Sequence, residues 1–178
     1  MSAASSYYEI DSPVGQLLLV GGAAGLESIH FEPRGKPHAP EPAWRRSKAP
    51  FGSLIAQLKR YFAGELREFD VELAPAGTPF QQLVWSELRR IPFGSVLSYG
   101  ELARRIGRPT AFRAVGAANG ANPWPIVVPC HRVIGSDRSL TGFGGGLTAK
   151  QTLLRLEAET SGAAWLVPSP GPRDRGYR

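Results

Sequence analysis

The chain has 178 residues, 42% of them hydrophobic and 20% charged, and a formal net charge of +6, as in an ordinary globular protein with one or two cores. Its single cysteine excludes an internal disulfide, a two-cysteine redox motif and a multi-cysteine zinc site, and its three histidines are too far apart in sequence to form a local metal pair. The first residues do not resemble a signal peptide and no apolar run approaches spanning length, so we expect a cytoplasmic protein without a membrane segment.

Residues 1–78 are expected to form a small N-terminal α/β domain. The proline-rich segment 33–50 is predicted to be an exposed loop or a poorly ordered segment, and hydrophobic residues at helical spacing then predict a helix over 51–62. Alternating apolar residues over 69–73 predict a further strand. An antiparallel meander is predicted from three apolar runs that turn sequences separate: 7–10, 16–20 and 26–31.

Residues 79–160 are expected to form a second, mostly helical domain, followed by a tail at 161–178. The domain starts after a short linker, and its first helix is predicted over 79–90. Thr78 and Gln81 have capping-box spacing around a proline, which suits the first position of a helix.

A helix-turn-helix is predicted within 98–123, where two short helical patterns flank Gly107. Arg113 lies near the start of the second helix, where a recognition helix meets nucleic acid. An ordinary helical hairpin in a core would show the same pattern. Charge favours DNA, because residues 79–160 have ten Lys/Arg against five Asp/Glu, and nine of the ten are arginine. A solvated basic surface without a polyanionic partner is the alternative.

Cys130 follows a β-branched run and Pro129, and it precedes His131 and Arg132. A lone cysteine is usually a small buried hydrophobic residue. A neighbouring imidazole and guanidinium can instead lower the pKa of a thiol and make it a nucleophile. Pro129 argues against a continuing strand and predicts a turn, which a Cys–His contact or a bridging water would require.

A histidine that acts as a base needs an acid to fix its tautomer. Glu157 shares the inward face of a predicted final helix with Leu153 and Leu154, whereas Glu159 does not. The helix is expected to start at a capping box over 148–151. A carboxylate on that face needs a partner, and His131 is the candidate, although a solvated helix-end charge is the alternative. The glycine run at 142–146 either brings backbone amides close to a ligand or is a plain loop.

Together these motifs resemble the O6-alkylguanine-DNA alkyltransferases, or methylated-DNA–protein-cysteine methyltransferases. The resemblance rests on RAVG, ANP, PCHRV, GFGGG and an LLxLE helix, in this order within residues 79–157. It implies an α/β (α+β) fold in which a small antiparallel sheet and a helix precede a helical domain with the helix-turn-helix and the active-site cysteine. It also implies DNA repair, in which Cys130 accepts the alkyl group of O6-alkylguanine, and of O4-alkylthymine, irreversibly and once per molecule.

The resemblance further implies roles for the matching residues. His131 is the base, acting through a water, and Glu157 orients it. Tyr99 helps to rotate the target base and protonates the departing guanine, while Arg113 takes the place of that base in the stack. Asn122 braces the turn that presents the cysteine. The implied DNA-contacting residues of the recognition helix are Ala114, Gly116 and Ala117, and the implied base-pocket residues are Pro125, Trp124, Val133 (through its carbonyl), Phe143 and Gly144.

Two pocket positions depart from the family pattern. Phe143 stands where many members have tyrosine, so a phenolic contact to the base is absent. Trp124 occupies a position that is usually smaller, where it would restrict large alkyl groups or only cover the pocket.

The implied partner is double-stranded DNA that contains O6-alkylguanine, bound through its minor groove. We expect a monomer in the absence of DNA, with cooperative binding on DNA left open, and no metal or other cofactor. The alternative is a non-catalytic helix-turn-helix protein that binds alkyl lesions, with a structural Cys130. A Cys–His–Glu hydrolase is a more distant possibility.

Overall fold

The N-terminal sheet contains the predicted meander and one additional strand. The computed structural model describes residues 5–32, 36 and 38–163, so most of the predicted tail lies outside the described residues. The predicted antiparallel pairing is confirmed, since β1 pairs with β2 and β2 with β3. The strands are β1 (Ser6–Ile10), β2 (Leu17–Gly22) and β3 (Gly25–Phe31).

A fourth strand, β4 (Arg45–Arg46), pairs in parallel with β1, and the order is β3-β2-β1-β4. The sheet is therefore mixed. The sequence predicts no strand in the segment 33–50, whereas the structure has a short strand there. The free edge of β1 explains the addition, because an unpaired strand edge offers hydrogen-bonding groups. There, the amide of Ser47 donates to the carbonyl of Tyr7 at 3.0 Å.

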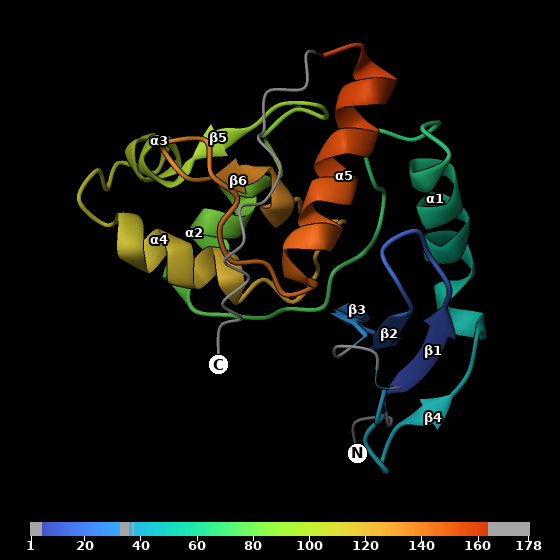
Figure 1. Cartoon of the computed structure of the whole chain (residues 1–178). Coiled ribbons are helices and arrows are strands. Elements are labelled where there is room, and N and C mark those ends of the chain that lie inside the picture. Colours follow the sequence, from blue (N-terminus) through green and yellow to red (C-terminus); the bar gives the residue numbers. More distant parts are fainter. Residues whose placement is uncertain (1–4, 33–35, 37, 164–178) are drawn as a thin grey trace.

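The predicted first helix is present as α1 (Gly52–Phe62), preceded by a 3-10 turn (Ala49–Phe51), and it packs beside the sheet (Figure 1). The predicted strand over 69–73 is wrong, because only its last residue forms an isolated bridge. The backbone there crosses the start of β3 and makes two hydrogen bonds to Leu26, too few for a ladder.

The second half is mostly helical, as predicted. α2 (Pro79–Leu88) begins at the predicted capping box of Thr78 and Gln81 and ends two residues earlier than expected. α3 (Tyr99–Arg105) and α4 (Phe112–Gly120) form the predicted pair of short helices. The last helix starts two residues before the predicted capping box, which does not form, because Gly145 takes the cap position. The remaining elements are β5 (Leu97–Ser98), β6 (Val133–Ile134), which pairs in parallel with β5, and α5 (Gly146–Ser161).

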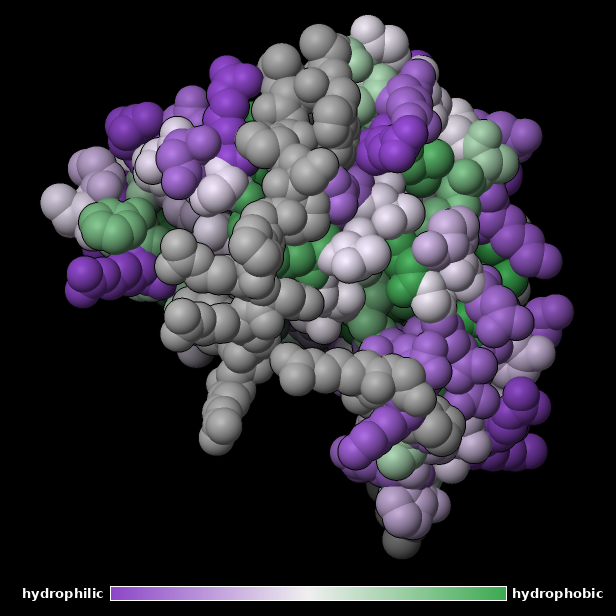
Figure 2. Space-filling view, viewed as in Figure 1, coloured by the Kyte–Doolittle hydropathy of each residue, from purple (hydrophilic) through white to green (hydrophobic). Residues whose placement is uncertain are grey.

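One hydrophobic core joins the two halves. In Figure 1, α5 stands between α1 on one side and the α2–α4 group on the other. The core contains Leu19 and Leu58 from the first half, and Leu88, Val115 and Leu153 from the second, each fully buried. On the face that Figure 2 shows, hydrophilic residues are prominent around the periphery, and hydrophobic ones are visible between them. Among the described residues, no helix is long and apolar enough to cross a membrane.

Candidate active site

Cys130 lies at the start of a tight 3-10 turn, Cys130–Arg132, that leads into β6. Its amide donates to the carbonyl of Val128 at 2.8 Å, and the amide of Arg132 donates to the carbonyl of Pro129 at 3.1 Å. The predicted turn at Pro129 is confirmed, and its cause is that proline has no N–H with which to continue a strand ladder. The turn buries both Cys130 and its neighbour His131.

A cavity of about 200 Å³ lies against Cys130. Pro125, Phe143 and Gly144, which the resemblance placed in the base pocket, all line it. Asn122 and Asn119 line it as well, and a further wall comes from β3 in the other half of the chain. The structure therefore brings the thiol, the glycine run and the end of α4 around one space.

Two further residues of the implied base pocket, Trp124 and Val133, are not among those that line this cavity. Trp124 is 5% exposed, packs edge-on against Trp85 at 5.3 Å, and donates from Nε1 to the carbonyl of Leu26 at 2.8 Å. That hydrogen bond holds the indole between the two halves of the molecule and away from the cavity. Val133 has a fully buried side chain, and its carbonyl accepts from Nζ of Lys150 at 2.5 Å.

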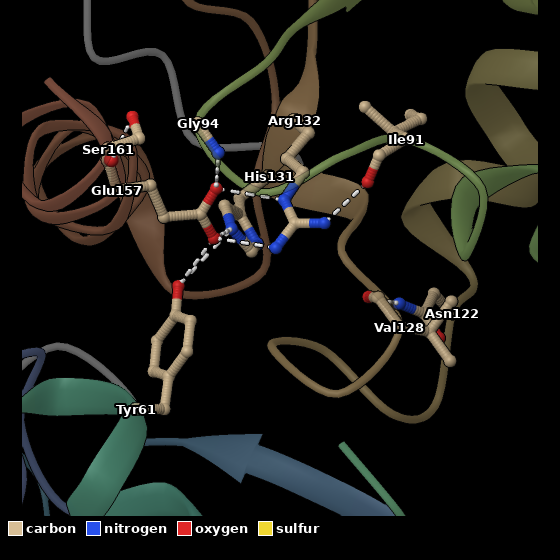
Figure 3. Close-up of polar contacts among 9 residues, drawn as sticks. All are labelled: Tyr61, Ile91, Gly94, Asn122, Val128, His131, Arg132, Glu157 and Ser161. Carbon is tan, nitrogen blue, oxygen red and sulfur yellow. Dashed lines mark hydrogen bonds and ion pairs between the residues drawn. The ribbon is translucent and has the colours of Figure 1, made fainter. Parts of the chain in front are cut away.

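A buried polar cluster is centred on Glu157, which is 0% exposed (Figure 3). Its Oε1 accepts from Nε2 of His131 at 2.8 Å, from the hydroxyl of Tyr61 at 2.8 Å and from Nη2 of Arg132 at 3.0 Å. Its Oε2 accepts from Nε of Arg132 at 2.9 Å and from the amide of Gly94 at 3.0 Å. This geometry excludes the alternative of a solvated helix-end charge. The set Tyr61, His131, Arg132 and Glu157 is called the Glu157 cluster below.

The sequence suggests that Arg132 adds positive potential beside the sulfur, but in the structure the charge of its guanidinium is paired with Glu157. Its guanidinium is directed at Glu157, and its Nη1 donates to the carbonyl of Ile91 at 2.6 Å. Burial alone would raise the pKa of Glu157, but the adjacent His131 and Arg132 together hold that pKa far below its usual range. Glu157 is therefore an anion whose charge is balanced by Arg132.

His131 is neutral in this environment and has a defined tautomer. Burial lowers the pKa of its imidazole, and the opposing effect of Glu157 does not restore it. Because Nε2 lies 2.8 Å from the Glu157 carboxylate, the proton is assigned to Nε2 and the lone pair to Nδ1. Nδ1 is buried and has no hydrogen-bond partner among the described residues. The cluster thus presents a proton acceptor in the turn that carries Cys130.

A second group of side chains fixes backbone carbonyls around the cysteine turn. Asn122 donates from Nδ2 to the carbonyl of Val128 at 2.8 Å and accepts from the amide of Trp124 at 3.0 Å, so it links two parts of the loop that precedes Cys130. Asn119 reaches the carbonyl of Cys130 at 3.4 Å. Together with Lys150, these asparagines form what we call the carbonyl-anchoring group.

Lys150 is fully buried and ties the glycine run to β6. Its Nζ donates to the carbonyls of Val133 at 2.5 Å and Thr141 at 2.8 Å. Burial lowers the pKa of Lys150 to about 8, and the proximity of Cys130 opposes that shift. Burial also raises the pKa of the Cys130 thiol, which Asn122 and Lys150 offset only in part. The resting cysteine is therefore a thiol.

The predicted DNA-contacting residues of the helix-turn-helix lie in different environments. Arg113 lies on the exposed side of α4, with its guanidinium 5.9 Å from the ring centre of Phe112. Tyr99, at the start of α3, is half-buried, and its hydroxyl accepts from that of Thr141 at 3.4 Å. A side chain at Gly116 would meet the Tyr99 ring at 3.8 Å. Ala114 and Ala117 are exposed on α4.

Sequence reasoning missed three residues of this site. Lys150 precedes Leu153 by three positions and Leu154 by four, so its helical spacing could have placed it on the buried face. Asn119 similarly lies one helical turn after Val115. Tyr61 has no such signal, because its spacing in the sequence predicts only one more aromatic core residue of α1.

Comparisons with known proteins agree on one family. The family model for the 6-O-methylguanine DNA methyltransferase DNA-binding domain matches residues 79–159, and that for the ribonuclease-like domain matches residues 5–75. A methylated-DNA–protein-cysteine methyltransferase from Methanosarcina acetivorans is 50% identical, and the match covers 85% of this chain and 97% of that protein. One from Mycolicibacterium paratuberculosis is also 50% identical, covering 89% of this chain and 95% of that protein. The O6-methylguanine methyltransferase structure from Mycobacterium tuberculosis has a TM-score of 0.80 at 48% identity, covering 88% of this chain and 94% of that one. A structure of Mycobacterium tuberculosis OGT in complex with DNA has a TM-score of 0.79 at 49% identity, covering 87% and 94%.

Proposed function

Because the chain belongs to the methylated-DNA–protein-cysteine methyltransferase family, we propose that it repairs O6-alkylguanine in cytoplasmic DNA by moving the alkyl group onto Cys130. O4-alkylthymine is a second substrate of the same chemistry. The proposal depends on one observation: a cavity-lining cysteine is followed by a buried imidazole whose Nε2 is held by Glu157 and whose Nδ1 has no hydrogen-bond partner among the described residues.

The transfer is a displacement at saturated carbon. The sulfur of Cys130 attacks the alkyl carbon, the carbon–O6 bond breaks, and its electron pair remains on the guanine. The thiol proton passes through a water to Nδ1 of His131. The guanine takes a proton from the hydroxyl of Tyr99, and solvent then reprotonates that hydroxyl. The products are an S-alkylcysteine and an unmodified guanine.

The Glu157 cluster supports the proton transfer. When Nδ1 of His131 accepts the thiol proton, the ring becomes an imidazolium, and Glu157 already lies 2.8 Å from its Nε2. A positioned general base of this kind contributes roughly 10²- to 10⁴-fold to a rate. The thiol needs this help because burial raises the pKa of Cys130.

The reaction is used once per protein molecule. A thioether sulfur is a poor leaving group, and the chain has no second cysteine that could accept the alkyl group. Repair is therefore stoichiometric, and the protein is consumed.

Double-stranded DNA is the partner, and α4 is the recognition helix. Cys130 is buried, so the target base must leave the duplex to reach it, at a cost of a few kcal/mol of unstacking. The exposed small residues Ala114 and Ala117 let the backbone of α4 approach the minor groove closely. Arg113, also exposed on α4, fills the space that the base leaves.

Mass spectrometry of the Cys130 peptide tests the transfer. After incubation with O6-methylguanine duplex, we expect a gain of one methyl group per protein molecule on that peptide. Cys130→Ser should show no gain and should bind the duplex with nearly unchanged affinity. An unmodified Cys130 after prolonged incubation would favour the alternative, a lesion-binding helix-turn-helix protein with a structural cysteine.

Arg113→Ala tests the role of the recognition helix. We expect the extrusion of a fluorescent base analogue to weaken more than the affinity for undamaged duplex. Equal losses in both measurements would count against a role in the base stack. Affinity should also fall as salt rises, since arginine–phosphate contacts release counterions, and a minor-groove ligand should compete with the protein for DNA.

A further inference from the structure

The outer edge of β3 forms a wall of the cavity that holds Cys130. Ile29, His30 and Phe31 line this cavity together with Cys130 and Phe143. These three residues belong to the N-terminal half, to which the proposed reaction assigns no contact with the alkyl group. The half of the chain without the cysteine therefore helps to shape the space into which the substrate must fit.

Hydrogen bonds fix this wall relative to the cysteine turn. The amide of Ile29 donates to the carbonyl of Pro123 at 2.8 Å, and Nε1 of Trp124 donates to the carbonyl of Leu26 at 2.8 Å. Asn122, next to Pro123, braces the turn that presents the thiol. The segment that positions Cys130 is thus the same segment that holds β3.

Phe31 is the aromatic residue that β3 contributes to this wall. It packs edge-on against Phe143, with ring centres 5.1 Å apart, and the ring of Phe143 in turn lies 6.4 Å from that of His131. A Cβ atom added at Gly145 would lie 2.7 Å from the Phe31 ring, so the ring rests directly on the backbone of the glycine run. An aromatic wall therefore extends from β3 to the catalytic imidazole.

On the basis of the proposed function, we propose that Phe31 limits the size of the alkyl group that Cys130 accepts. Pockets for drug-sized ligands usually enclose about 300–1,000 Å³, whereas this cavity has about 200 Å³. A small alkyl group adds little to the volume of the guanine, whereas a bulky aromatic group can enter this cavity only if the Phe31 ring moves away. Trp124, the residue that the sequence suggested for this restriction, lies outside the cavity.

Phe31 can be shortened without touching the proton-transfer machinery. Its ring contacts are with Phe143 and the backbone at Gly145, and it belongs neither to the Glu157 cluster nor to the carbonyl-anchoring group. Loss of the ring should therefore change the relative rates at which large and small alkyl groups are transferred, and the ratio of these rates is the quantity to measure.

The test compares free O6-benzylguanine with free O6-methylguanine as substrates of the full chain. The rate of each alkylation is measured from the mass of the Cys130 peptide, so that DNA binding does not enter. We expect Phe31→Ala to raise the benzyl-to-methyl rate ratio about tenfold or more, the scale on which a pocket discriminates by size. Phe31→Leu should raise it less, and it serves as the milder variant if the alanine protein is unstable.

Tyr8→Ala is the matched control, because it removes an aromatic ring from β1 of the same sheet and Tyr8 does not line the cavity. Its rate ratio should equal that of the wild type. An unchanged or lower ratio in the folded Phe31 variants would overturn the inference, whereas the proposed function is judged on the methyl transfer of the wild type. A wild-type protein that transfers neither group would instead overturn the proposed function, and this inference with it.

Discussion

The Glu157 cluster and the carbonyl-anchoring group both bury a formal charge beside the Cys130 turn, but they stabilise that charge differently. In the first, the Glu157 anion accepts five hydrogen bonds, and the Arg132 cation compensates it. In the second, the ammonium of Lys150 donates to two neutral carbonyls. Carbonyl dipoles compensate a buried cation less well than an anion does.

The pKa values reflect this difference. Burial would raise the pKa of Glu157, yet its partners hold it far below the usual value, whereas burial lowers the pKa of Lys150 to about 8. The first group therefore keeps its charges through the physiological range, as the proposed proton transfer requires. The second is close to losing its charge, and its contribution is to hold backbone carbonyls in place.

The largest effect should follow from Glu157→Gln, which breaks the first group at its centre. The variant leaves the Arg132 cation buried without a counter-ion, so the free energy of unfolding should fall by about 3–5 kcal/mol. Methyl transfer should slow by roughly 10²-fold or more, because the imidazolium loses its anion. Denaturant unfolding and the rate of Cys130 alkylation measure these effects. A variant with wild-type stability and rate would show that the buried contacts do not matter.

Tyr61→Phe should have the next largest effect, because it removes one donor and keeps the carboxylate. A hydrogen bond to a charged group is worth about 2 kcal/mol, and the unfolding free energy should fall by that amount. The less stabilised Glu157 anion attracts a proton on His131 more strongly, so the acid limb of the rate–pH profile should move to higher pH. Phe62→Leu, on the same helix, should not move that limb. An unshifted limb in Tyr61→Phe would separate Tyr61 from the proton transfer.

Lys150→Met should change how stability depends on pH. The folded pKa of about 8 lies below the unfolded value of 10.5, so the unfolded chain binds more protons between these values. Wild-type stability relative to the variant should therefore rise between pH 7 and pH 9, by about 1 kcal/mol. Urea unfolding at both pH values measures it. Equal pH dependence in the two proteins would mean that folding does not lower the pKa of Lys150.

Glu159→Gln should have the smallest effect and serves as the control for Glu157→Gln. Glu159 lies two positions further along α5, is exposed, and pairs with Arg155 at 2.7 Å. Exposed i,i+4 pairs add little to stability. Its melting temperature and alkylation rate should match those of the wild type. A large loss in this variant would remove the contrast between buried and exposed carboxylates on which the comparison rests.

Local sequence patterns predicted the elements that depend on neighbouring residues. The capping box at Thr78, the turn at Pro129 and the inward face of Glu157 all follow from spacing within a few residues, and the structure contains each. The prediction for 69–73 failed because apolar alternation does not specify a partner strand, and the first residue of the final helix differed because its cap is a glycine without a side-chain bond.

The sequence by itself determined the family, the mostly helical second half and the inward face on which Glu157 lies, because motif residues and helical periodicity are local features of the chain. Only the tertiary structure decided which distant side chains complete the site. Tyr61 is 96 residues from Glu157, and Phe31 meets Phe143 only through the packing of the two halves. Contacts of this kind depend on how the two halves pack around a shared core, and local sequence patterns do not predict that packing.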